Sequence, residues 1–155
     1  MFNKRYLTIL CLILVNLVLF VSNTSAAKWR KETVDNSGDV GKSDSIAVDK
    51  SGKVHISYYD IDNNTLKYAT NASGSWVTTT IDSNDSFDYY TSIALDSSDK
   101  VHISYHFSPS GYYGALKYAT NVSGSWTTTT VDSIGLDNDI AIDSSDKVHI
   151  SYFDN

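Results

Sequence analysis

Hydrophobic and polar residues alternate along most of the chain from Trp29 onward. In the segment VHISY (54–58), for example, every second residue is large and apolar. This is the period of a β-strand, because successive side chains point to opposite faces. No stretch of 11 residues has the apolar period of a helix, and Pro109 is the single proline. The pattern predicts an all-β protein of short strands joined by turns.

The alternating pattern is itself repeated. The segments SIAVDKSGKVHISY, SIALDSSDKVHISY and IAIDSSDKVHISY place Ile46, Ile93 and Ile140 at intervals of 47 residues. A period in the forties is the length of one four-stranded β-propeller blade. We therefore expect β-propeller blades built as four-stranded antiparallel sheets, in an incomplete propeller of two full blades plus partial blades.

The repeat also sets the expected domains and strands. Residues 28–44 form a closure strand and linker, 45–91 the first blade, 92–138 the second, and 139–155 the first two strands of a third. Between the first two strands of each blade lies a D-x-S-[GD]-K turn, in which Gly52 or Asp99 can adopt positive φ. The expected strands are 29–35; 45–49, 53–59, 65–70 and 76–82; 92–96, 100–106, 115–120 and 126–132; and 139–143 and 147–153.

The segment WRKETVD (29–35) resembles the fourth-strand segment WVTTTID (76–82), although it precedes the first full repeat. Propellers commonly close when an N-terminal strand supplies the outermost strand of the last blade, so we expect this role for 29–35. Two blades with fragments fall short of the four to eight of a ring. We expect the reading frame to continue past Asn155 with an LKYATN-like strand and the remaining blades. Made alone, the chain is expected to self-associate through open edges at 29–35 and 147–153.

Each full repeat carries a glycine turn and a tryptophan between its third and fourth strands, as in NASGSW (71–76). In this feature the chain from Trp29 to Asn155 resembles the secreted bacterial β-propeller repeats of the sialidase-type (BNR or Asp-box) group. The segment lacks the central aspartate of S-x-D-x-G-x-x-W and is one residue shorter between glycine and tryptophan. The resemblance implies a propeller fold. Sialidase-type catalysis implies three arginines around a carboxylate, and the chain beyond residue 27 contains one arginine, Arg30, and one glutamate, Glu32.

The N-terminal 27 residues have the pattern of a secretory signal peptide. Lys4 and Arg5 precede an apolar run over 7–21, which is shorter than the about 20 residues that span a bilayer, and small residues follow at 25–27. We expect cleavage after Ala27 and a secreted, periplasmic or cell-surface protein. Cys11, the single cysteine, would leave with the signal. The remaining 10 basic and 18 acidic side chains give a net charge of −8, which disfavours nucleic acid as a partner.

Loop lengths indicate where a ligand could bind. Trp29 and Trp76 are 47 residues apart, but Trp76 and Trp126 are 50 apart, and the extra residues fall in the loop HFSPSGYYGA (106–115). This loop and the one before the next blade share one face of a propeller, and such loops commonly carry binding groups. Aromatic rings beside carboxylates suit a sugar, although the same residues could simply pack the loops together. The candidate ligand-binding residues are Phe87, Tyr89, Tyr90, Tyr112, Tyr113, Asp60 and Asp62, with Asp85, Asp88, Asp137 and Asp139 around them.

The histidines and acidic loops give no catalytic or metal assignment. His55, His102 and His149 recur at one strand position, so we expect structural roles with hydrogen bonds between neighbouring blades. His106 is unique and lies on the variable face, with no serine or cysteine partner that the sequence identifies. The segment 60–64 alternates oxygen side chains, but Thr65 stands where a calcium-binding EF-hand needs glycine. We predict no catalytic residues, cofactor or metal.

Three functions remain open from the sequence. The first is a binding or adhesion module whose ligand is a carbohydrate or a cell-surface protein. The second is a fragment of a sialidase-like glycoside hydrolase. The third is a structural spacer made of near-identical repeats.

Overall fold

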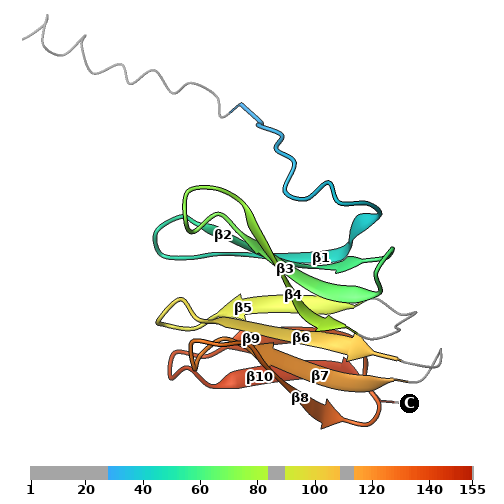
Figure 1. Cartoon of the computed structure of the whole chain (residues 1–155). Helices are drawn as coiled ribbons and strands as arrows, with labels where there is room; N and C mark the ends of the chain where they lie inside the picture. Colours follow the sequence, from blue (N-terminus) through green and yellow to red (C-terminus); the bar gives the residue numbers. More distant parts are fainter. Residues whose placement is uncertain (1–27, 84–89, 109–113, 155) are drawn as a thin grey trace, which may run out of the picture. The chain divides into compact units, whose positions relative to one another are not determined.

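The computed structural model describes residues 28–83, 90–108 and 114–154 (Figure 1). The chain divides into two units, residues 1–32 and 33–155. In the described part of the first unit, Arg30 forms an ion pair with Glu32 at 3.3 Å; the expected signal peptide lies outside the described residues. Among the residues that the structure describes, no helix is long and apolar enough to cross a membrane.

The described strands of residues 33–155 form three antiparallel sheets in which neighbours in sequence are neighbours in the sheet (Figure 1). The first sheet contains β1 (Val40–Val48), β2 (Val54–Asp60), β3 (Thr65–Thr70) and β4 (Val77–Ser83). The second contains β5 (Thr91–Leu95), β6 (Val101–Phe107), β7 (Ala115–Thr120) and β8 (Thr127–Asp132), and the third contains β9 (Leu136–Ile142) and β10 (Val148–Phe153). The prediction of an all-β protein is confirmed, and the three sheets form an open stack.

Two strands begin earlier than predicted. β1 starts at Val40 instead of residue 45, and β9 starts at Leu136 instead of residue 139. Both extensions cross a register shift, and each contains a residue with positive φ, Ser43 at 50° and Asp137 at 47°. A bulge lets a strand continue pairing where its sequence no longer alternates. The period of apolar residues therefore indicated only the regular part of these strands.

The structure has no strand at 29–35, where one was predicted, and the closure role of this segment stays a prediction. An outer strand of a sheet is stable only when it forms hydrogen bonds with a neighbouring strand. The third sheet has two strands in the described residues, so the third strand that would pair with a closure strand is not among them. The segment 33–35 is irregular instead.

The predicted D-x-S-[GD]-K turns are confirmed. In the first, the Asp49 carboxylate accepts hydrogen bonds from the backbone N–H groups of Ser51 and Lys53, both at 2.8 Å. The fourth residue of the turn has positive φ, with values of 76° at Gly52 and 58° at Asp99. Aspartate tolerates this conformation better than most residues with a side chain, so the turn keeps its shape when glycine is replaced.

The sheets pack face to face, with their first strands β1, β5 and β9 next to one another. The main core lies between the first and second sheets. It includes Tyr59, Leu66 and Tyr68 from the first, and Ile103 and Tyr105 from the second. Every residue of β6 from Val101 to His106 is buried because both of its faces are covered. The last strands, β4 and β8, carry exposed threonines, as predicted for outer strands.

Equivalent hydrogen bonds join consecutive sheets. The backbone N–H of Ile93 donates to Ser45 Oγ at 3.2 Å, and that of Ile140 donates to Ser92 Oγ at 3.3 Å. These bonds connect first strands at the same position of the repeat. Each sheet is therefore attached to the next by the same chemistry.

The D-x-S-[GD]-K turns are also joined to one another. Asp99 Oδ1 accepts the backbone N–H of Lys50 at 3.4 Å, and Asp146 Oδ1 accepts that of Ser97 at 2.7 Å. In each case the acceptor is the positive-φ residue of the later turn and the donor belongs to the earlier one. Gly52 holds the corresponding position in the first sheet and has no carboxylate.

Candidate functional site

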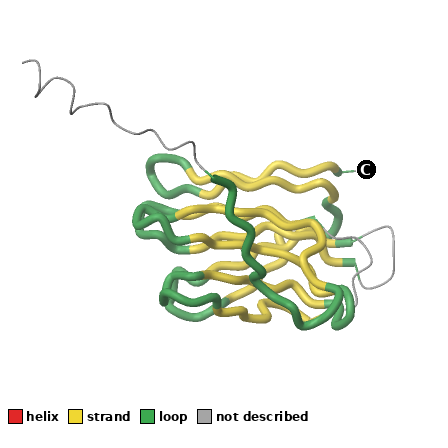
Figure 2. The backbone as a smooth tube through the Cα atoms, turned by 90° about the horizontal axis from the view of Figure 1, so that it is seen from above, coloured by secondary structure: helices red, strands yellow, loops and turns green. Residues whose placement is uncertain are grey.

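The described residues that border the loops of varying length lie at one end of the stacked strands, which we call the variable end. It is formed by the turn 61–64 and by the residues that border the connections between strands, namely Tyr90, Ser108, Gly114 and 133–135. Backbone bonds join these connections: the His106 N–H donates to Tyr90 O at 3.0 Å, and the Gly135 N–H donates to Gly114 O at 3.1 Å. The D-x-S-[GD]-K turns, which join the first two strands of each sheet, lie at the opposite end, on the left of Figure 1, and Figure 2 shows loops gathered at that end.

Two of the predicted ligand-binding carboxylates accept hydrogen bonds from within the first sheet and its adjoining loops. Asp60 is buried, with 3% of its surface exposed, and accepts hydrogen bonds from the backbone and side-chain amides of Asn63 at 3.0–3.1 Å. Asp62 is exposed, and its Oδ2 accepts the backbone N–H of Asp39 at 2.9 Å. Both carboxylates therefore stabilise the loop structure of the first sheet.

The other described candidates are Tyr90, Asp137 and Asp139. Tyr90 is 45% exposed, while its carbonyl oxygen also accepts a bond from Asn138 Nδ2 at 3.3 Å. Asp137 is exposed, and Asp139 accepts the hydroxyl of Ser92 at 2.6 Å. The remaining predicted residues lie outside the described residues: Phe87, Tyr89, Tyr112, Tyr113, Asp85 and Asp88.

His106 is fully buried and does not reach the surface of the variable end. Gly114 packs against it so closely that a Cβ at Gly114 would lie 2.6 Å from His106 Nε2 and 2.3 Å from Phe107 O. This glycine is needed for a close approach of two backbones.

The repeated histidines bond within their own sheets, so the expectation of bonds between blades is wrong. His55 Nδ1 lies 2.6 Å from the Tyr68 hydroxyl, and its Nε2 lies 3.5 Å from the Asp49 carboxylate. His102 makes the same pair of contacts with Tyr118 and Asp96. These triads link the first turn of a sheet to its third strand, so their role is structural.

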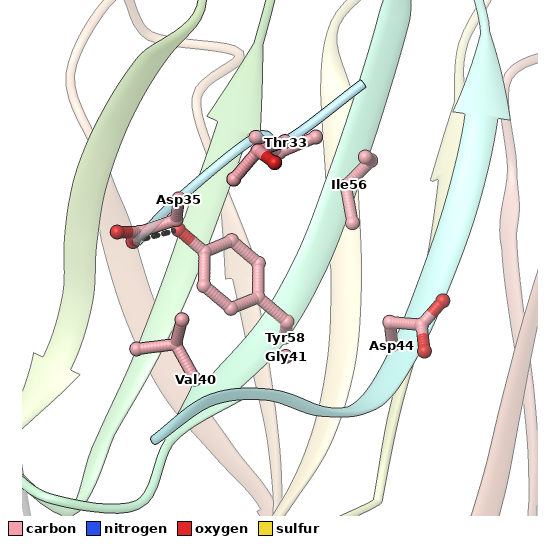
Figure 3. Close-up of a pocket in the computed structure, with 8 residues that line it drawn as sticks. Thr33, Asp35, Val40, Gly41, Asp44, Ile56 and Tyr58 are labelled. Carbon is pink, nitrogen blue, oxygen red and sulfur yellow. Dashed lines mark hydrogen bonds between the residues drawn. The ribbon is translucent and has the colours of Figure 1, made fainter. Parts of the chain in front are cut away.

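A second group of polar residues lies on the outer face of the first sheet, where sequence reasoning placed no site. The Tyr58 hydroxyl donates to Asp35 Oδ2 at 2.7 Å, and Lys67 Nζ lies 2.5 Å from the same oxygen. Asp35 and Tyr58 border a pocket of about 290 Å³, which is also lined by Thr33, Val40, Asp44 and Ile56 (Figure 3).

Comparison of the chain with models of known families, with curated proteins and with solved structures found no match. The assignment of function therefore depends on the geometry of these two regions. In the part of the chain that the structure describes, no group of three or more His, Cys, Asp or Glu side chains is arranged to hold a metal ion.

The electrostatics of the pocket are those of a closed ion pair. Burial alone would raise the pKa of Asp35, but hydrogen bonds from Lys67, Tyr58 and Ser37 outweigh burial and hold that pKa well below its ordinary value. Burial and the hydrogen bond to Asp35 raise the pKa of the Tyr58 hydroxyl. Neither group changes its charge near neutral pH, so the arrangement suits attachment rather than proton transfer.

The same arrangement occurs between the first and second sheets. The Tyr105 hydroxyl donates to Asp82 Oδ2 at 2.7 Å, and Lys117 forms an ion pair with that carboxylate. Asp82 lies near the end of β4, the outer strand of the preceding sheet, and Asp35 precedes it by one repeat of 47 residues. Asp35 therefore contacts Tyr58 of the first sheet in the same way as Asp82 of β4 contacts Tyr105 of the second sheet. The 23-residue spacing of Asp35 and Tyr58, repeated in Asp82 and Tyr105, was the available sequence signal.

Proposed function

We propose that the chain is a β-propeller segment, exported from the cell, that acts as a binding or adhesion module for a carbohydrate or a cell-surface protein. The propeller is supported by the repeated four-stranded sheets with β1, β5 and β9 adjacent, since the first strands of propeller blades surround a common axis. Export rests on the signal-like pattern of residues 1–27.

The observation that carries the binding function is the division between a constant end and a variable end. The D-x-S-[GD]-K turns and the bonds between first strands recur from repeat to repeat, whereas the length changes fall in connections whose described bordering residues bond to one another at the variable end. A rigid scaffold with differing loops at one end is how many proteins present a ligand site. Tyr90, exposed at this end, offers an aromatic face for a sugar or protein.

A structural spacer is the second candidate. It is favoured by the internal hydrogen bonds of Asp60, Asp62 and Asp139, which leave these carboxylates engaged with the fold. In this case near-identical sheets would only set a distance within a surface protein.

Binding of the purified chain to a glycan array and to cell-surface extracts separates the two candidates. For a binding module we expect binding that falls at least tenfold in Tyr90→Ala, because the loss of an aromatic contact at an interface commonly costs about 2 kcal/mol. The matched control is Val122→Ala, which is 49% exposed in the turn between β7 and β8 at the opposite end. Silence of the wild type on both supports, or equal binding by all three proteins, would reject the proposed site.

A further inference from the structure

The outer face of the first sheet is apolar, and its β1 residues are uncovered, whereas Tyr58 of β2 is buried and bonded to Asp35. We call it the leading face and define it by Ile46, Val48, Ile56 and Tyr58. Ile46 is 61% exposed and Val48 is 59% exposed. One repeat later, Ile93 is only 7% exposed because the first sheet covers it. The leading face therefore has the composition of a buried interface.

The chain itself indicates what covers such a face. Ile103 and Tyr105 are the repeat equivalents of Ile56 and Tyr58, and they pack in one cluster with Tyr59 of the preceding sheet. The Tyr59 hydroxyl then donates to the backbone oxygen of His106 at 2.7 Å. An aromatic side chain near the end of a second strand thus fills the position that corresponds to the pocket of the leading face.

The outer face of the third sheet corresponds, by repeat position, to the face of the first sheet that packs against the second sheet. We call it the trailing face and define it by Asp139, Ala141, His149, Ser151 and Phe153. It contains a shallow hollow of about 240 Å³, and Phe153 is 51% exposed. By repeat position Phe153 corresponds to Tyr59, and both are aromatic residues.

Polar groups on the two faces also match. Between the second and third sheets, Ser104 Oγ donates to the side-chain oxygen of Asn138 at 2.6 Å. Ser151 holds the position of Ser104 one repeat later, while Asp44 holds the position of Asn138 two repeats earlier. A trailing face placed on a leading face would bring the Ser151 hydroxyl to the Asp44 carboxylate, which is an acceptor.

We propose that the leading face binds the trailing face of a second copy of this chain, with Phe153 of that copy entering the pocket beside Ile56 and Tyr58. The contact repeats, between chains, the packing found twice within the chain. It joins two different surfaces, so it is head to tail and leaves one face of each kind free at the ends of a dimer. Larger assemblies follow by the same contact. This proposal does not depend on ligand binding at the variable end.

Sedimentation velocity of purified variants tests the proposal. Ile46→Glu places a charge on the leading face, and Phe153→Glu places one on the trailing face. Each variant alone keeps only one competent face, so both should be monomeric at concentrations where the wild type associates. An equimolar mixture should form 1:1 dimers and nothing larger, because the intact trailing face of Ile46→Glu fits the intact leading face of Phe153→Glu.

The other outcomes would overturn the proposal. A monomeric wild type refutes it directly, and association of Phe153→Glu alone would instead mean that two leading faces pair with each other. Association of both variants alone would assign the contact to another surface, residues 1–27 included, since these are common to all samples. Val122→Glu, at the far end of the second sheet, should behave as the wild type, and circular dichroism of each variant confirms that its strands are retained.

Discussion

Replacing the same isoleucine in two consecutive repeats tests the packing of the sheets. Ile93 and Ile46 occupy equivalent positions in β5 and β1, but their exposed fractions are 7% and 61%. Ile→Ala removes three carbon groups, worth about 0.8 kcal/mol each when fully buried. With the cavity left behind, we expect Ile93→Ala to lower the free energy of unfolding by about 3 kcal/mol. Ile46 has only about two fifths of its side chain to lose from burial, so Ile46→Ala should cost about 1 kcal/mol.

Urea unfolding followed by tryptophan fluorescence measures both variants. Trp126 is a suitable reporter because its ring lies 5.1 Å from that of Tyr68 across the interface between the first and second sheets. The protein is kept dilute so that association through the leading face does not stabilise Ile46. Val122→Ala, in a turn, serves as the control for an exposed apolar residue. Equal losses in Ile93→Ala and Ile46→Ala would refute the face-to-face packing of the first two sheets.

Two further predictions concern the bonds that attach one sheet to the next. Burial alone would raise the pKa of Asp82, but hydrogen bonds from Lys117 and Tyr105 outweigh burial and lower that pKa. The ionised Asp82 should therefore stabilise the folded protein above the unfolded pKa of about 3.9, and this contribution should be lost as the pH falls toward the folded pKa. In urea titrations between pH 7 and pH 3, the stability gap between wild type and Asp82→Asn should therefore shrink below about pH 4, and a constant gap would contradict this origin. Tyr105→Phe removes a buried bond to the same carboxylate and should cost about 2 kcal/mol. Tyr152→Phe removes the equivalent bond to Asp132 at a tyrosine that is 37% exposed, so its loss should be clearly smaller, and comparable thermal shifts in the two variants would argue against burial as the cause.

The sequence predicted the parts of the fold that depend on neighbouring residues. Alternation located the second strand of each sheet and the third strands of the first two sheets within about one residue, and the turn pattern predicted positive φ at Gly52 and Asp99. Bulged extensions such as that before Ser45 could not be predicted, because they depend on the partner strand. The absence of strand structure at 29–35 has the same cause.

The candidate site was less predictable because the sequence does not show where each side chain finds its partner. Asp60 was a reasonable ligand-binding residue, yet the amide groups of its own turn satisfy it first. Position in the repeat put His55 on one face of β2, but its partners are Asp49 and Tyr68 of the same sheet. The role of Asp35 becomes visible only when two consecutive sheets are compared in space.

The hydrogen bonds between the D-x-S-[GD]-K turns give the repeats a direction. Asp99 and Asp146 each receive a donor from the turn before, whereas Gly52 offers no carboxylate to a preceding unit. An array lengthened by gene duplication should therefore contain additional copies of the second repeat (92–138), with the first repeat kept at the N-terminal end. In an array made from the first repeat alone, glycine would occupy the acceptor position of every turn, and the backbone N–H of the preceding turn would have no carboxylate to bind.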